Sequence, residues 1–308
     1  MSDVKIESST SSTAPATPAK PEKARSLFDD AMRELVHRPL FWISLVLVVL
    51  VLTMAAFPGL FTSVSPRACS LANQHLPPSK DAWFGYDFQG CDVYSRTIYG
   101  ARASVMVGFL GVAVTTVLAF AFGMVSGYFG GWADAILSRI IDIVLGIPFV
   151  LAAVVFASRF NSGSGTDTGM TAVVLAIGLL GWTTAARVVR ASVISAKNQD
   201  YVAAARMIGA SHLRIMWRHI LPNALAPVVV ILTISLGAFI SAEATLTFLG
   251  VGLRGTAVSW GLDIDSAQRH FRESIWPLVF PASFLALTVL GFIMLGDVIR
   301  DAFDPKLR

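Results

Sequence analysis

Two carboxylates interrupt long apolar segments of this chain, Asp142 and Glu243. A charged side chain within a bilayer is costly and usually faces a partner charge or a watery path, so both acids are candidates for a pore or a gate. Asp142 follows Arg139 by three residues, a spacing that also allows an ion pair on one helix face. Glu243 lies about 20 residues, or ~30 Å, into its segment, near the predicted outer mouth. It can attract a substrate ammonium, form part of a gate, snorkel or pair with Arg254.

Patterns that would indicate catalysis or nucleotide binding are missing from the sequence. No lysine follows a glycine, which excludes a Gly-Lys-Ser/Thr phosphate loop. The five histidines form no pair at i,i+4, and there is no Gly-x-Ser-x-Gly elbow. We therefore expect no enzymatic activity, no cofactor and no metal in this chain. Any energy for active transport must come from an ion gradient or from another subunit.

The composition predicts an all-α polytopic membrane protein. The 308 residues are 55% hydrophobic and only 14% charged, with a mean hydropathy of +0.66, whereas soluble domains carry about 25% charged residues. The net charge of +4 is too small and scattered to indicate nucleic acid. A transmembrane helix needs about 20 apolar residues. Six segments meet this requirement, roughly 40–62, 101–128, 135–157, 170–189, 223–249 and 277–296.

The distribution of basic residues predicts that both termini are cytoplasmic. With the N-terminus inside, the inner segments hold 16 of the 24 Lys and Arg residues and the outer segments hold 8. Residues 1–24 are poor in large apolar side chains and are expected to form a disordered tail, followed by a short amphipathic helix to Arg38. Residues 161–169 read as a flexible loop.

Both cysteines, Cys69 and Cys91, lie in the polar segment of about 63–100, which this topology places outside. A disulfide persists in an oxidising compartment, and closing a loop of about 22 residues is worth ~3 kcal/mol in the chain-entropy model. We expect a bridge, and the alternative is two free thiols.

Small residues predict close helix packing in two spans. Gly123-xxx-Gly127 and Gly127-xxx-Gly131 belong to the second span and its exit, and Gly178 and Gly181 belong to the fourth.

The cytoplasmic stretch 200–222 has the pattern of a helix, a break and a second helix. The Ala-rich run from Tyr201 favours a helix, which Gly209 can end in a left-handed cap, and Ser211 can cap the next helix. The i, i+3, i+4, i+7 spacing predicts one apolar face, and Pro222 is expected to stop this helix. That face comprises Leu213, Met216, Trp217 and Ile220. A plain cytosolic linker is the alternative.

This stretch resembles the EAA loop of ATP-binding-cassette importer permeases, Glu-Ala-Ala-x3-Gly-x9-Ile-x-Leu-Pro. The matching positions are Ala203, Ala204, Ala205, Gly209, His219, Leu221 and Pro222. Two of them depart from the pattern, because Ala203 replaces the Glu and His219 replaces the Ile. A His before Ile-Leu-Pro-Asn-Ala is itself similar to the peptide-permease branch.

Three further segments extend the resemblance over about residues 83–308. They look like the C-type subunit of dipeptide and oligopeptide permeases. The segments are Phe84 to Arg102, Glu243 to Gly252 with Ser259-Trp-Gly261, and Leu295 to Pro305. That family typically has Gly-Arg-Asp where this chain has Gly90-Cys91-Asp92, a departure that supports a lineage-specific bridge to Cys69.

The resemblance implies a type I importer permease of six transmembrane helices. It divides the chain into a tail with a short helix (1–39), a first span and outer loop (40–100), a permease core with the coupling loop 200–222 (101–297), and a cytoplasmic tail (298–308). The partners it implies are a homologous second permease subunit, two ATP-binding subunits that hold ATP and Mg, an extracytoplasmic peptide-binding protein and the peptide itself. The loop would couple to an ATPase through the matched residues and Ser211.

Two other functions remain open from the sequence. A permease for nickel or another small solute resembles the same branch. A self-sufficient channel or ion-coupled carrier belongs to a different class, and it would function without ATPase subunits.

Overall fold

The computed structural model describes residues 35–160 and 166–303, apart from the side chains of 166–168. The predicted disordered tail, most of the amphipathic helix and most of the predicted flexible loop lie outside these ranges. The described part is helical, with two isolated β-bridges at Cys69–Cys91 and Tyr86–Asp92. This confirms the all-α fold class. The helices are α2 (Pro39–Ala56), η1 (Pro58–Leu60), η2 (Leu71–Asn73), α3 (Val93–Phe129), α4 (Gly131–Gly146), α5 (Phe149–Phe160), α6 (Thr166–Lys197), α7 (Asp200–Met207), α8 (His212–Arg214), η3 (Ile215–Ile220), α9 (Leu221–Phe248), α10 (Trp260–Gln268) and α11 (Trp276–Phe303).

Five of the described helices are long and apolar enough to cross a membrane, and α4 with α5 makes a sixth if that bent pair counts as one span. The third span predicted over 135–157 is divided into two helices, because α4 and α5 meet at 87°. The bend lies at Ile147 and Pro148. Proline disfavours the helical region for the residue before it, and Ile147 is extended with φ −87° and ψ 127°.

Helix α3 begins at Val93, which is eight residues before the predicted start of the second span at 101. The side chain of Asp92 caps it by accepting a hydrogen bond from the Tyr94 N–H at 2.9 Å. The helix has 37 residues, or about 55 Å at 1.5 Å per residue, so it extends well beyond a 30 Å hydrocarbon core. The boundary drawn from the sequence at 100/101 therefore falls inside one continuous helix.

Helices α3 and α6 pack through backbone contact. A Cβ atom on Gly123 would lie 2.7 Å from the Ala186 carbonyl oxygen, and one on Gly127 would lie 2.9 Å from the Arg190 carbonyl oxygen. Only glycine fits at such distances, which confirms the close packing predicted from the first small-residue motif. The second motif makes no such contact, because a Cβ on Gly131 would have no atom within 4 Å.

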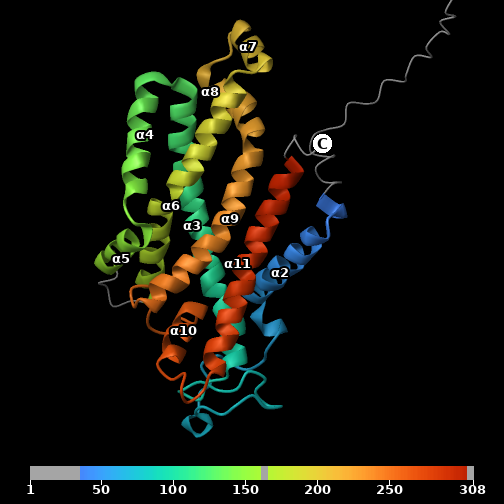
Figure 1. Cartoon of the computed structure of the whole chain (residues 1–308), viewed down its shortest axis with the longest axis vertical. Helices are drawn as coiled ribbons and strands as arrows, with labels where there is room; N and C mark the ends of the chain where they lie inside the picture. Colours follow the sequence, from blue (N-terminus) through green and yellow to red (C-terminus); the bar gives the residue numbers. More distant parts are fainter. Residues whose placement is uncertain (1–34, 161–165, 304–308) are drawn as a thin grey trace, which may run out of the picture.

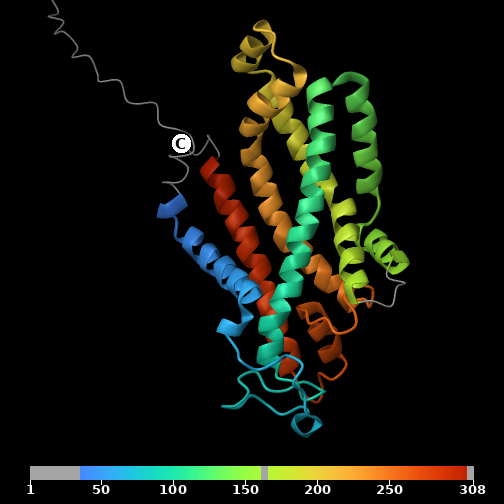
Figure 2. The same ribbon diagram turned by 180° about the vertical axis from the view of Figure 1, so that it is seen from behind.

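The described helices form an elongated bundle with two distinct ends (Figures 1 and 2). Helices α7 and α8, the start of α2 and the end of α11 lie toward one end, which we call the elbow end. The loops between α2 and α3 lie at the other end together with α10, and we call this the disulfide end. The elbow and the disulfide loop are thus separated by the length of the membrane-spanning helices.

Candidate functional site

The elbow, residues 200–222, begins with a helix that ends in a left-handed turn. Gly209 has φ +79°, a conformation that costs a side-chain-bearing residue energy. The Gly209 N–H donates to the Arg206 carbonyl at 3.0 Å, and the Ala210 N–H donates to the Ala205 carbonyl at 3.1 Å. This is the Schellman pattern of helix termination. Ser211 then accepts from the Arg214 N–H at 3.4 Å and caps the next helix, as the sequence predicts.

The second half of the elbow differs from the prediction in two ways. Pro222 does not stop the helix, since α8, η3 and α9 follow one another as a single apolar helix from His212 to Phe248. The segment η3 is π-helical, and the Leu221 N–H bonds to the Met216 carbonyl, five residues back. This wider turn directly precedes Pro222, which has no N–H for the usual bond to residue 218.

The π turn also changes which side chains share a face. The predicted apolar face is wrong for Leu213 and Trp217, which are 68% and 64% exposed. Ile215, Met216 and Ile220 are the buried residues. Their i, i+1, i+5 spacing fits a helix with i→i+5 hydrogen bonds rather than a 3.6-residue period.

The elbow is fixed to the ends of two long helices. The Tyr128 hydroxyl, near the end of α3, lies 2.8 Å from Nδ1 of His212. Lys197, at the end of α6, donates to the Tyr128 carbonyl at 2.8 Å. Val202 and Ile215 are buried in one apolar cluster with side chains of α3 and α6. A force on the elbow would therefore pass directly into α3 and α6.

The tip of the elbow carries two large apolar side chains that the sequence analysis did not single out. Met207 is 83% exposed and Ile208 is 85% exposed, directly before the Gly209 turn. The resemblance drew attention to the alanines beside them, and no periodic pattern distinguishes an exposed apolar tip from a buried one. Of the predicted coupling residues, Ala203, Ala204, Gly209, Ser211 and Pro222 are exposed, His219 and Leu221 are half-buried and Ala205 is buried.

Glu243 is fully buried in α9, and it neither snorkels nor pairs with Arg254. Its carboxyl group accepts hydrogen bonds from the hydroxyls of Ser104 in α3 at 2.8 Å and Thr247 in α9 at 3.0 Å. Arg254 bonds instead to the carbonyl oxygen of Gly250 at 2.7 Å. Glu243 thus joins α9 to α3, and its role in a gate stays a prediction.

Asp142 connects two helices through ion pairs. Its carboxylate lies 2.6 Å from Nη2 of Arg187 in α6 and 3.8 Å from Nη1 of Arg139 in its own helix. Arg190 of α6 holds Asp134 of α4 in the same way, with both of its contacts at 2.6 Å. The sequence spacing predicted only the Arg139 pair. A pore role for Asp142 stays a prediction.

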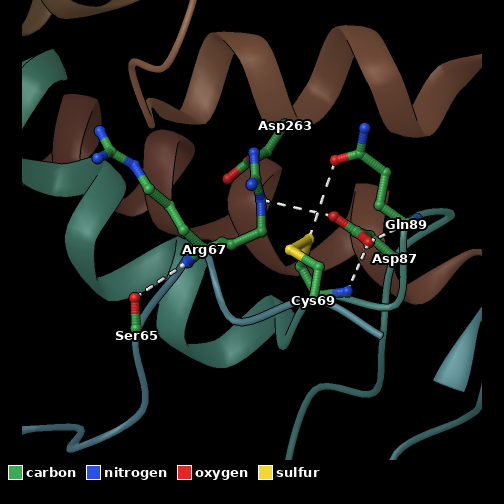
Figure 3. The surroundings of a disulfide bond; sticks show 8 residues. Ser65, Arg67, Cys69, Asp87, Gln89 and Asp263 are labelled. Carbon is green, nitrogen blue, oxygen red and sulfur yellow. Dashed lines mark hydrogen bonds and ion pairs between the residues drawn. A yellow bond between two sulfur atoms is a disulfide. The ribbon is translucent and has the colours of Figure 1, made fainter. Parts of the chain in front are cut away.

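At the disulfide end, Cys69 and Cys91 are joined by a disulfide that closes a separation of 22 residues (Figure 3). Both Gln89 and Cys91 donate their backbone N–H to one oxygen of Asp87, at 2.8 and 2.9 Å. The Asp87 N–H donates to the Cys91 carbonyl at 3.0 Å. These bonds make the loop a compact cap on the start of α3.

Beneath this cap, Arg96 of α3 forms a largely buried ionic cluster. Its Nε lies 2.9 Å from the carboxylate of Asp263 in α10 and 3.6 Å from that of Asp87. Burial raises the pKa of Asp263, and the Arg96 guanidinium opposes this shift. The cluster ties the cap to α3 and α10, across 167 residues of sequence.

Comparison with known proteins places this arrangement in a family. The family model described as binding-protein-dependent transport system inner membrane component matches residues 119–308. The model described as N-terminal TM domain of oligopeptide transport permease C matches residues 26–78. The chain is 36% identical to the oligopeptide transport system permease protein OppC of Bacillus subtilis (strain 168), covering 93% of this chain and 92% of that protein.

Two further comparisons agree. The dipeptide transport system permease protein DppC of the same strain is 37% identical, with 92% of this chain and 87% of that protein covered. A solved chain of the MetNI methionine ABC transporter, in an inward-facing conformation, has a TM-score of 0.52 at 19% identity. The match covers 67% of this chain and 96% of the solved chain, and it supports the fold alone.

The family model and the two relatives define the class of this membrane-spanning bundle, which is the transmembrane permease of ATP-binding-cassette importers. The chain belongs to the family of binding-protein-dependent transport system inner membrane components, as a permease of the oligopeptide and dipeptide type. It is a multi-pass inner-membrane protein and the transmembrane component of its importer, not the ATPase. Membership in this family implies ATPase and binding-protein partners.

Proposed function

We propose that this chain forms half of a peptide-conducting pore and that its elbow docks on an ATPase subunit in the cytoplasm. The complete importer would contain this chain, a homologous second permease subunit and two ATPase subunits that bind ATP and Mg. An extracytoplasmic binding protein would deliver di- or oligopeptides to the disulfide end.

One observation supports the docking proposal above the others. Met207 and Ile208 are more than four-fifths exposed, at a tip that projects from the end of the bundle (Figure 1). Exposed apolar groups of this size are typical of a surface that a partner covers. The partner would be an apolar groove on an ATPase. Residues Ala203 and Ala204 are small and exposed beside the tip, so they allow close approach.

The contacts behind the tip provide the route for transmission. His212 attaches the elbow to Tyr128 of α3, and Lys197 of α6 bonds to the same tyrosine. The segment η3 continues into α9 without a break. When ATP closes the ATPase pair, the elbow would move as a rigid body with these helices. Such a rigid-body rotation would alternate the pore between two states.

The direct experiment places a charge at the tip. We expect Ile208→Asp to reduce recovery of the ATPase subunits with the purified complex at least tenfold, because a buried, unpaired carboxylate is costly. Leu71→Asp is the matched control, since Leu71 is 75% exposed at the disulfide end. Full ATPase recovery with Ile208→Asp would contradict the proposal.

A second experiment separates docking from transmission. In Gly209→Val, the added Cβ would have no atom within 4 Å, so the effect of the substitution comes from backbone strain and not from a steric clash. A β-branched residue at φ +79° strains the turn. We expect peptide uptake to fall while the complex still assembles. Uptake at the wild-type rate would show that the turn geometry is not needed for coupling.

A further inference from the structure

The disulfide end carries a cavity that is lined by two arginines and, among the residues whose side chains the structure describes, by no acid. Its volume is about 580 Å³. Arg67, from the loop before the disulfide, and Arg102, from α3, both line it. Tyr99 and the hydroxyls of Ser63 and Ser65 add polar groups to the wall.

Neither arginine forms an ion pair within the described residues. Arg67 donates from Nη2 to the Thr256 carbonyl at 2.7 Å. Arg102 donates from Nε to the Ala55 carbonyl at 3.1 Å and from Nη2 to the Ala56 carbonyl at 3.2 Å. These bonds fix the guanidinium groups, and no carboxylate of the described side chains balances their charges. Each group keeps N–H donors free, because a guanidinium has five. In Figure 3 the Arg67 side chain extends away from the disulfide, while its backbone N–H bonds to Ser65.

Apart from Thr256, the rest of the cavity wall is apolar. Met106 of α3, Met170 of α6 and Leu253 lie in it beside Ala103 and Ala257. A pair of fixed guanidinium groups selects a carboxylate by charge-assisted hydrogen bonds. An apolar wall selects the uncharged body attached to that carboxylate. The C-terminal residue of a peptide combines both features.

A second cavity lies further along the same helix face. It has a volume of about 500 Å³ and is lined by Gly181 and Thr184 of α6 together with residues of α5 and α9. Met170 and Gly181 are eleven residues apart, close to three full turns, so they point in nearly the same direction about 16 Å apart along the axis. The charged cavity therefore lies at the outer end of a helix face that leads to a second, more apolar cavity.

We propose that the cavity of Arg67 and Arg102 binds the C-terminal carboxylate of the incoming peptide at the outer end of the translocation path. This proposal rests on the peptide cargo of the importer family and on the disulfide end facing outward. It does not depend on how the elbow engages an ATPase. The arginines hold the peptide end, and the apolar wall receives its last side chain.

The test uses protection of an introduced thiol in the assembled importer, in nanodiscs and without the binding protein. Cys69 and Cys91 are paired, so Met106→Cys provides one reactive thiol in this chain on the cavity wall. The rate of maleimide labelling at that position is measured by mass spectrometry at increasing concentrations of the peptide Ala-Ala-Phe, and separately of its C-terminal amide. We expect the free acid to protect the thiol at a concentration about tenfold lower than the amide, the effect of losing a charged hydrogen bond.

Variants assign the effect to the two arginines. Arg67→Gln with Arg102→Gln should remove the preference for the acid, and the corresponding lysine pair should retain part of it because the charge remains. Arg254→Gln is the matched control, since Arg254 is also exposed, belongs to the neighbouring loop and lines no part of the cavity. It should leave the preference intact.

Two results of this assay would overturn the proposal, which are equal protection by the acid and the amide and absence of protection by either. A third would come from a separate measurement with peptide-free binding protein added, if that protein protects the thiol and the peptides do not. The last result would mean that an acidic side chain of the binding protein occupies the cavity. The elbow variant Ile208→Asp, whose complex is expected to lack the ATPase subunits, should still show the preference for the acid, so a failure of ATPase docking is distinguishable from a failure of this site.

Discussion

Removing the disulfide should open the outer loop locally without unfolding the bundle. The bond closes 22 residues, for which the chain-entropy model gives about 3 kcal/mol. With 1.4 kcal/mol for each factor of ten, the opened loop should become on the order of a hundredfold more populated. The perturbation is Cys69→Ala with Cys91→Ala, because Cys91 is fully buried and a serine there would bury a hydroxyl.

Amide hydrogen exchange measures the population of this opened loop directly. The backbone N–H groups of Ser70, Asp87 and Cys91 all donate hydrogen bonds within the loop. Their exchange depends on the population of the opened loop. We expect the segment 70–92 to exchange on the order of a hundredfold faster in the double variant. Segments from the centre of α3 and α6 should be unchanged and serve as the internal reference.

The ionic cluster beneath the loop limits the effect. Arg96 pairs with Asp263 of α10, outside the loop, at 2.9 Å, so the opening should stop at the start of α3. Exchange in segment 70–92 that equals the wild-type rate would refute the reasoning, since it would mean that backbone bonds alone hold the loop. Faster exchange throughout α3 would refute the claim that the cap opens by itself.

Three further changes test the packing of the bundle. Gly123→Val should push α3 from α6 and lower the melting temperature of the complex, by an overpacking cost of about 1–3 kcal/mol; an unchanged melting temperature would contradict the close contact. Glu243→Gln should keep both hydroxyl partners and near wild-type uptake, whereas Glu243→Ala should destabilise by about 2 kcal/mol in a melting assay; loss of uptake with Gln at full stability would instead indicate that the charge itself acts. Arg96→Met leaves Asp87 and Asp263 unpaired and should cost about 3–5 kcal/mol in the same melting assay, and a loss below 1 kcal/mol would show that the cluster is not structural.

Local signals in the sequence determined much of the architecture. Long apolar segments correspond to helices because an unsatisfied backbone group in lipid is too costly. The caps at Gly209 and Ser211 were predictable because they depend on a few neighbouring residues. The first small-residue motif predicted close packing of α3 for the same reason, and the structure shows that its partner is α6. Family resemblance added the elbow as the coupling element, which remains a proposal.

Tertiary structure decided the features that join distant segments. The 87° bend at Pro148 replaces a straight span, and a proline in an apolar run is equally compatible with a mild kink. The π turn before Pro222 moved Leu213 and Trp217 out of the predicted buried face. No local spacing encodes either result, because each depends on which surfaces the neighbouring helices offer.

The ion pairs show most clearly which features the sequence determined and which the tertiary structure decided. Arg96 and Asp263 are 167 residues apart, and Arg190 and Asp134 are 56 apart. The sequence determined that these charges flank apolar helices, since charge is excluded from lipid. Only the packing of α3 against α6 and α10 decided which charges meet, and that Arg67 and Arg102 line one cavity with no acid among its described side chains. Ion pairing depends on distances of a few ångströms in space, and those distances exist only once the helices have packed.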